Sequence, residues 1–277
     1  MGEKRRGITA DLSGWLVYSA VTLFVLVVGS IFLTVLLNSF ASSWFGGWLP
    51  DGYTGKWYAF AVNEFSLWRV LLVTLIVALS VTAISLVVGV PAAYALARRR
   101  FRGKSLVLGL LILPLLVPPI TYGIPLATML YEYRMAGTVA GVILANLAPA
   151  LPFVVLIMTP FIEQIDPNLE RAARMMGAPT LKVFTRVLLP LAVPGILAAG
   201  LLVLVRTVAM FELTFLTAGA GSQTLVVALY YAAFSAGIRP AQSIDAMAVI
   251  YMLTTLVLLI AALRFVNPTN MVMRVKQ

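Results

Sequence analysis

Cysteine and histidine are both missing from this sequence of 277 residues. The absence of cysteine excludes a disulfide framework, a thiolate nucleophile and a cysteine metal site. The absence of histidine excludes Ser-His-Asp and Cys-His catalysis, histidine metal ligands and a histidine proton relay. A membrane enzyme built from this chain would need a carboxylate pair or a Ser-Lys pair instead. We therefore expect no catalytic residue, no metal site and a protein that is not an enzyme.

Charge is also scarce in this chain. Charged residues make up 11% of it and hydrophobic residues 61%, whereas soluble domains have about 25% and about 45–50%. A mean hydropathy of +1.00 agrees, and the composition predicts an integral membrane protein. The net charge of +10 would suggest a nucleic-acid partner in a soluble protein. In a membrane protein it reflects the lysines and arginines of cytoplasmic loops, so we expect no nucleic acid.

Six apolar stretches are each long enough to cross a bilayer as a helix, which takes about 20 residues. They cover residues 15–37, 68–97, 105–130, 138–162, 191–218 and 244–264. The first stretch is longer than the h-region of a signal peptide, which has about 7–15 residues, so we expect it to be a membrane span. The prediction is an all-α integral membrane protein with six transmembrane helices.

The positive charges are distributed unevenly between the two sides of such a bundle. Fifteen lysines and arginines lie at the two chain ends and in the loops after the second and fourth stretches, against four in the other loops. Because these residues accumulate on the inner side of a membrane, both termini are predicted to be cytoplasmic. The first outer loop, 38–67, is rich in aromatic residues: Trp44, Trp48, Tyr53, Trp57 and Tyr58. They fit either an aromatic belt at the membrane interface or a surface that touches an external partner.

The second, third and fourth stretches contain internal prolines. These are Pro91, Pro114, Pro118, Pro119, Pro125, Pro149, Pro152 and Pro160. A proline removes a backbone hydrogen bond and tends to kink a helix. The carbonyl groups that it frees need partners from neighbouring helices or from a water-lined cavity. This pattern favours a bundle that encloses a path over a plain membrane anchor.

The longest inner loop, 163–190, carries the signals of a short helix. Asp166 before Pro167 is typical of a helix start, with an N-cap acceptor followed by proline at the first helical position. Gly177 is a natural helix stop, so a helix is predicted over 167–176. One of its faces carries Leu169, Ala172, Ala173 and Met176, at i, i+3, i+4 and i+7. This face fits either a helix lying on its own bundle or membrane, or a helix seated in a groove of another protein.

This loop resembles the EAA loop of importer-type ABC transporter permeases, which runs Glu-Ala-Ala, three residues, Gly, nine residues, Ile-x-Leu-Pro. Ala172, Ala173 and Gly177 match, and Val187-Leu188-Leu189-Pro190 follows after nine residues, with valine in place of isoleucine. The glutamate of the pattern aligns with Arg171, and the acid stands one place earlier, at Glu170. The resemblance assigns coupling to an ATPase to the residues Leu169, Glu170, Arg171, Ala172, Ala173, Met176, Gly177 and Pro190.

The resemblance also implies an organisation and a set of partners. Residues 68–264 are the expected permease core, after an N-terminal span and outer loop in 1–67 and before a cytoplasmic tail in 265–277. The expected partners are a second permease subunit, by family habit a different chain, two ATPase subunits and an extracytoplasmic substrate-binding protein, in a bacterial inner membrane. ATP and Mg²⁺ are expected on the ATPase subunits and no cofactor in this chain. Gly103-Lys104-Ser105 looks like the end of a P-loop, but the glycine needed five positions earlier is Arg98.

Three short segments resemble the polyamine type of this family, especially spermidine/putrescine permeases. They are residues 101–104, 151–155 and 221–225. The implied function is import of a small polar solute, with a polyamine-like solute as one candidate. Opines, phosphonates and sugars stay open as substrates of the same importer class. An ion-gradient-driven secondary transporter is the alternative, and ATP depletion would spare it.

Two charges lie inside the predicted fifth span. A charge at mid-membrane costs at least about 2.5–3.5 kcal/mol, so it usually faces a cavity or a partner. Arg206 and Glu212 are six residues apart, which on a continuous helix separates them by about 120° and makes them poorly placed to pair. We interpret Glu212, Arg206 and, in the fourth span, Asn146 as candidate residues of a substrate pathway.

Overall fold

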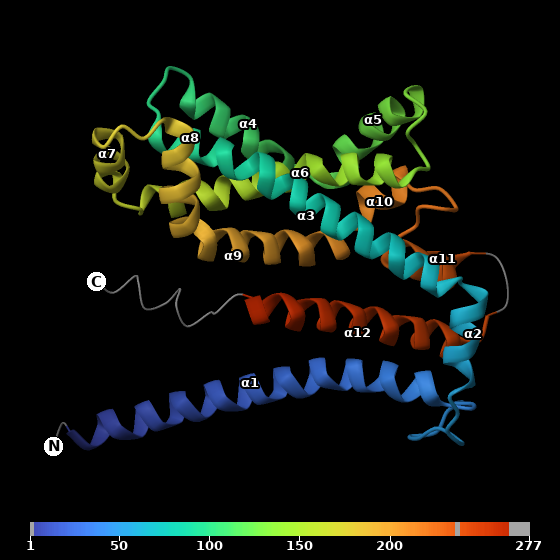
Figure 1. The fold of residues 1–277 in the computed structure, drawn as a ribbon. Helices are drawn as coiled ribbons and strands as arrows, with labels where there is room; N and C mark the ends of the chain where they lie inside the picture. Colours follow the sequence, from blue (N-terminus) through green and yellow to red (C-terminus); the bar gives the residue numbers. More distant parts are fainter. Residues whose placement is uncertain (1–2, 236–238, 266–277) are drawn as a thin grey trace. The chain divides into compact units, whose positions relative to one another are not determined.

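The computed structural model describes residues 3–235 and 239–265, with side chains for 14–235 and 239–264. These residues form helices and no β-strand, with one isolated bridge between Ala41 and Tyr53. The chain divides into two compact units (Figure 1). Unit 1 comprises Met1–Glu64 and Ala236–Ile250, and unit 2 comprises Phe65–Ser235 and Tyr251–Gln277.

Unit 1 consists of α1 (Glu3–Phe40), α2 (Lys56–Glu64) and the first part of α12 (Ala241–Phe265). The Gly14–Phe40 part of α1 is long and apolar enough to cross a membrane. Polar contacts gather at the C-terminal end of α1. Asn38 donates to the Asp245 carboxylate at 2.5 Å, and the hydroxyls of Ser39 and Tyr58 lie 2.7 Å apart. These contacts hold α1, α2 and the start of α12 together.

The core of unit 2 is built from three packed helices, α3 (Leu67–Arg98), α6 (Val139–Glu163) and α9 (Leu189–Val208). Val81, Val154 and Val203, one from each helix, are fully buried in it. Gly89 of α3 sits against Val154 of α6, where a Cβ would lie 2.7 Å from a valine methyl. Glycine is therefore what lets these two helices approach closely.

The expected third span is broken rather than kinked. It consists of α4 (Lys104–Leu116) and α5 (Pro119–Glu132), bent by 97° at the break. Val117 and Pro118 both have extended backbones, because each precedes a proline and the residue before proline disfavours the α conformation. Pro114 and Pro125 stay inside their helices. The prediction of one span over 105–130 therefore holds only if the bent pair crosses as a unit.

The expected fifth span, 191–218, begins earlier and ends earlier than predicted. Helical structure runs without interruption through α8 (Thr180–Val183), a π-helical turn (Phe184–Leu188) and α9. The π-turn ends at Leu188, two residues before Pro190, which has no N–H to donate in the α pattern. The helix stops at Val208, and a separate short helix, α10 (Glu212–Thr217), follows. The continuation of this span to residue 218 is wrong.

The remaining helices are α7 (Pro167–Met175) and α11 (Leu225–Phe234). Five helices of the described residues are long and apolar enough to span a membrane, and six spans result if the bent pair counts as one. The predicted all-α, membrane-spanning class is confirmed, with α7 as the short helix between the fourth and fifth spans. Apart from Phe265, the expected tail over 265–277 lies outside the described residues.

Candidate functional site

The short helix α7 has a defined start and stop. The Asp166 carboxylate accepts the backbone N–H of Asn168 at 2.9 Å, and proline occupies the first helical position. At the other end the N–H of Ala178 bonds the carbonyl of Ala173 at 3.1 Å, and Gly177 has a φ of +82°. This is a Schellman stop, in which glycine supplies the left-handed residue. The predicted helix is confirmed and ends one residue earlier than expected.

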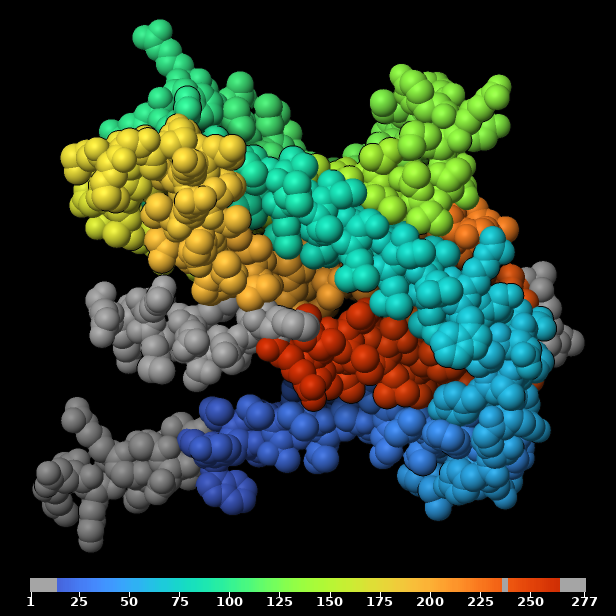
Figure 2. All heavy atoms as spheres, viewed as in Figure 1, coloured from blue at the N-terminus to red at the C-terminus, as the bar shows by residue number. Residues whose placement is uncertain are grey.

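The residues of α7 divide into a buried side and an exposed side. Glu170 and Ala173 are buried, whereas Leu169, Met175 and Met176 are 47%, 84% and 82% exposed. Ala172 is exposed as well. The predicted stripe is therefore divided: Leu169, Ala172 and Met176 are exposed, whereas Ala173, at its edge, packs inward beside Glu170. In Figure 2 α7, coloured yellow, lies at the surface of its end of unit 2.

Glu170 is held by side chains of α3 and of its own helix. Arg98 Nε lies 2.7 Å from Oε1, and the Tyr94 hydroxyl donates to Oε2 at 2.8 Å. Arg174, one turn along α7, lies 3.6 Å from Oε2 and 3.3 Å from the Tyr94 hydroxyl. We call Tyr94, Arg98, Glu170 and Arg174 the Glu170 anchor. With an exposure of 4%, Glu170 does not reach the outer surface of the chain.

Sequence reasoning missed Tyr94 and Arg98. Arg98 counted only as one of several basic residues after the second span. The available signal was their spacing of four residues, which places both side chains on one face of α3. Their pairing with a residue 72 to 76 positions later could not be read from that spacing. Of the other coupling residues, Arg171 is exposed and bonds Asn168 at 3.2 Å, and Gly177 and Pro190 are also exposed.

Two of the three predicted pathway residues share one pocket. Its volume is about 210 Å³, including space at its mouth, and its lining residues are Asn146, Pro149, Ala150, Val203, Arg206, Thr207 and Met210. Asn146 is buried, and its amide donates to the Val142 carbonyl at 2.8 Å and to the Thr214 hydroxyl at 3.2 Å. The Arg206 guanidinium lies over the Phe153 ring, 5.0 Å from its centre. The pocket thus joins a positive charge and an amide in an apolar surrounding.

Glu212 lies outside the lining of that pocket, as the first residue of α10. Because α9 ends at Val208, the helical-wheel argument for its separation from Arg206 does not apply. The conclusion still holds, since no described ion pair joins the two residues. Tyr122 of α5 interacts electrostatically with both Arg206 and Glu212. Its buried hydroxyl has no hydrogen-bond partner among the described residues.

An aromatic cluster flanks Glu212 and was not predicted. Phe211 and Phe215 stack with their ring centres 5.1 Å apart, and Tyr230 of α11 contacts both at 5.0 and 5.2 Å. Tyr231 and Phe234 extend the cluster along α11. Phe211 and Phe215 are the neighbours of Glu212 in sequence and in the next helical turn. Glu212 therefore lies in the chain segment that carries this cluster, and aromatic ring faces attract cations.

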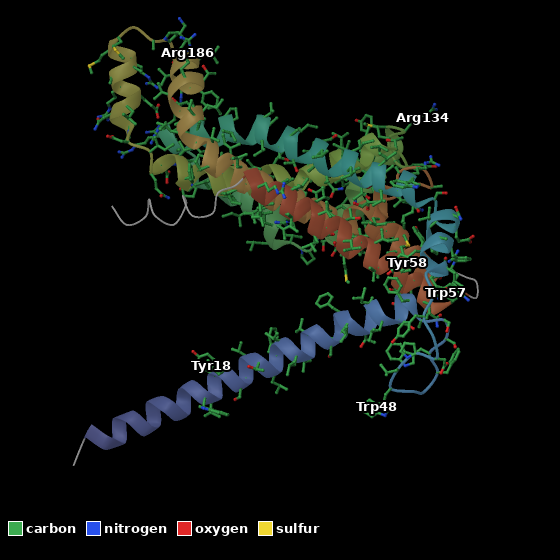
Figure 3. All side chains as sticks on the ribbon, turned by 60° about the horizontal axis from the view of Figure 1, so that its bottom comes forward. Tyr18, Trp48, Trp57, Tyr58, Arg134 and Arg186 are labelled. Carbon is green, nitrogen blue, oxygen red and sulfur yellow. The ribbon has the colours of Figure 1, made fainter. Side chains whose placement is uncertain are left out.

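The tryptophans of the loop that follows α1 fall into two groups. Trp44 and Trp57 donate their indole N–H groups within the loop, to Gly47 and Ala41, at 2.8 and 2.7 Å. Trp48 is 98% exposed and lies at the tip of the loop, apart from Trp57 and Tyr58 (Figure 3). Two of the three therefore stabilise the loop itself, and only Trp48 is presented entirely outward.

The two candidate regions lie at different ends of unit 2. In Figure 3 Arg186 marks the end that carries α7, and Arg134 marks the opposite end. The labels of Figure 1 likewise place α7 and α8 at one end and α5, α10 and α11 at the other, with α3 running between them. Both regions therefore belong to unit 2, whose helices run from one to the other.

Comparison with known proteins gives consistent matches. The family model described as binding-protein-dependent transport system inner membrane component matches residues 85–270. The spermidine/putrescine transport system permease protein PotC of Escherichia coli is 28% identical over 234 residues, covering 83% of this chain and 86% of PotC. The molybdenum transport system permease protein ModB of Haemophilus influenzae is 35% identical over 173 residues, covering 57% and 76%.

Solved structures show the same fold. A chain of a bacterial ABC transporter involved in the import of alginate, an acidic polysaccharide, superposes with a TM-score of 0.76. It is 16% identical, and the match covers 92% of this chain and 97% of that one. The substrates named for these relatives and neighbours differ in charge and size. The matched proteins therefore share one architecture but carry names that specify different solutes.

Proposed function

The chain belongs to the family of binding-protein-dependent transport system inner membrane components, and from this premise we propose that it is the permease subunit of an ATP-driven importer. A second permease subunit, two ATPase subunits and an extracytoplasmic binding protein complete the proposed complex, in a bacterial inner membrane. Both termini and α7 lie on the cytoplasmic side. ATP and Mg²⁺ are bound by the ATPase subunits, so this chain supplies the path and the docking helix.

The observation that carries the proposal is the outward face of α7. Leu169, Met175 and Met176 are large apolar side chains that stand exposed beside Ala172, on a helix whose other face is fixed to its own bundle. Methionine is flexible and polarizable and suits a protein partner's groove. The alanine lets a partner's backbone approach closely. A capped helix with an apolar outer stripe is the form in which a helix seats in a groove.

Site-specific crosslinking tests this docking. The chain has no cysteine, so Met175→Cys places a unique thiol on the outward face of α7. Expressed with its native partners, this variant should crosslink to an ATPase subunit. The matched control is Val87→Cys, at an exposed apolar position of α3, which should not crosslink to it. A chain that purifies without an ATPase, and whose introduced thiol on α7 captures none, would contradict the importer and favour an ion-coupled carrier.

The solute that we propose is small, polar and cationic, of the polyamine kind. Glu212 beside the aromatic cluster supports this, because a carboxylate and ring faces together favour an ammonium group. The extent of the match to PotC, 83% of this chain, supports it independently. The match to ModB and the position of Arg206 in the pocket make a molybdate-like anion the competing solute.

Uptake by the reconstituted complex separates these two solutes, with putrescine and molybdate as probes. We expect putrescine uptake in the wild type and its loss in Glu212→Gln. The control is Glu132→Gln, an exposed carboxylate at the end of α5. Unchanged putrescine uptake in Glu212→Gln removes Glu212 from the path, and molybdate uptake by the wild type makes the solute an anion.

A further inference from the structure

The Glu170 anchor leaves no oxygen of its carboxylate unused. Oε1 meets Arg98 at 2.7 Å, and Oε2 meets Tyr94 at 2.8 Å and Arg174 at 3.6 Å. The side chain of Glu170 is 6% exposed and that of Arg98 13%. Short charge-assisted hydrogen bonds in a buried setting have a defined geometry and hold their partners firmly. The anchor is therefore a rigid joint rather than a solvated surface pair.

The anchor joins α7 to the helix that runs through unit 2. Tyr94 and Arg98 lie in the last two turns of α3, and α3 packs along both α6 and α9 in the core. Arg98 also donates to the Ile165 carbonyl at 2.7 Å, just before α7 begins. One arginine thus ties the end of α3 to both α7 and the segment that leads into it.

α7 also packs against α8 and the π-helical turn, and its connections there are uncharged or short. Ala173, the second buried residue of the helix, contributes only a methyl group. On the C-terminal side the chain turns through Gly177, whose backbone is left-handed, before Pro179 leads into α8. Without the anchor, α7 would lose its side-chain hydrogen bonds to α3 and would be free to shift relative to that helix.

We propose that Glu170 is a positioning residue that makes α7 and the end of α3 move as one body. This inference rests on the proposed function, since it takes an ATPase docked on α7 as the source of the movement. Displacement of α7 then passes through Glu170 and Arg98 into α3 and on to the far end of unit 2. When the joint is lost, the ATPase still docks, but its rate of ATP hydrolysis no longer responds to the conformation of the permease.

The test uses the complete complex in lipid nanodiscs, with ATP and Mg²⁺. Hydrolysis is measured with and without the extracytoplasmic binding protein, purified with its own bound ligand, and the amount of co-purified ATPase is measured in parallel. In Glu170→Gln we expect normal docking but a loss of about tenfold in the stimulation by the binding protein, within the 5–150-fold range of coupling between sites. A residue that served folding alone would lower docking and stimulation together.

Glu163→Gln is the matched control. Glu163 pairs with Lys104 at 3.5 Å at the same end of unit 2, but its side chain is 47% exposed, and such surface pairs contribute little. It should keep the stimulation of the wild type.

Tyr94→Phe keeps the fold and the ion pair while removing the hydroxyl that bonds Oε2, so it decides the matter if Glu170→Gln does not assemble. Reduced stimulation with normal docking supports the inference in either variant. Wild-type stimulation in Glu170→Gln, or in Tyr94→Phe when Glu170→Gln does not assemble, overturns it. A wild-type chain that binds no ATPase overturns the proposed function and this inference with it. If the binding protein stimulates hydrolysis equally in the wild type and in Glu170→Gln, the inference alone is overturned.

Discussion

The two ends of unit 2 differ in whether their charged side chains are paired. At the α7 end the buried carboxylate of Glu170 is matched by Arg98, Tyr94 and Arg174. At the other end Arg206 and Glu212 have no ion-pair partner among the described residues. A charge in an apolar setting is costly unless something compensates it. The first end therefore holds its charge in one geometry, whereas the second end leaves its two charges without an ion pair among the described residues.

The largest effect is expected from a substitution at Glu170, the buried carboxylate of the α7 end. Glu170→Ala leaves Arg98 buried without its partner, and removing one half of a buried ion pair costs about 3–5 kcal/mol. We expect faster hydrogen exchange of the α7 amides by a corresponding factor. Glu163→Ala, at the half-exposed pair with Lys104, should change exchange by far less. Equal protection of α7 in the two variants would mean that the anchor does not hold the helix.

The stop of α7 gives the next largest effect. Gly177 has a φ of +82°, and a Cβ there would meet no atom within 4 Å. Gly177→Ala should therefore cost only the backbone penalty of a left-handed residue, about 1–2 kcal/mol. Thermal unfolding and hydrogen exchange of α7 measure it. Gly109→Ala, in a helix and also with open space around its Cβ position, is the control and should be neutral or stabilising.

Removal of a charge at the pocket end should change the transport rate and leave the stability of the fold nearly unchanged. Arg206→Gln keeps a polar side chain in the pocket but removes the charge that lies over Phe153. We expect uptake to change by about tenfold, which corresponds to about 1.4 kcal/mol in the barrier, with no fall in the unfolding temperature. An unfolding temperature lowered as much as in Glu170→Ala would show that Arg206 is structural, and the contrast between the two ends would be lost.

The smallest expected effect is at the start of α7. Asp166→Ala removes the carboxylate that accepts the Asn168 N–H and should cost about 1 kcal/mol, a typical value for an N-cap. Asp166→Asn keeps an acceptor and should be close to wild type. Hydrogen exchange in the first turn of α7 distinguishes them. Equal loss in both variants would point to the charge of Asp166 rather than to its capping bond.

Local signals in the sequence predicted α7 well because caps act over a few residues. Asp166, Pro167 and Gly177 each act on their own backbone, and the helix begins and ends within one residue of the prediction. Which part of the predicted stripe is buried could not be read from the sequence, because periodicity marks a stripe but not the neighbour that covers it, and only Ala173 of the stripe is buried. The partner of Glu170 is another helix, brought there by the packing of unit 2.

The breaks in the third and fifth spans show the same limit. Internal prolines were recognised, but they act differently according to their neighbours. Pro118 and Pro119 in succession force an extended backbone and a 97° bend, whereas Pro149 and Pro152 remain inside α6. The stop at Val208 has no comparable signal, since residues 203–213 contain neither proline nor glycine.

The sequence by itself determined the membrane class, the number of apolar stretches and the short capped helix, because composition and local backbone preferences need no distant partner. Only the tertiary structure decided that Glu170 faces inward to Arg98, that Asn146 and Arg206 share a pocket and that Glu212 stands apart among aromatic rings. These relations join residues far apart in the chain. Which of them meet depends on how whole helices pack, and the physical reason is that burial and charge pairing are settled between helices rather than within them.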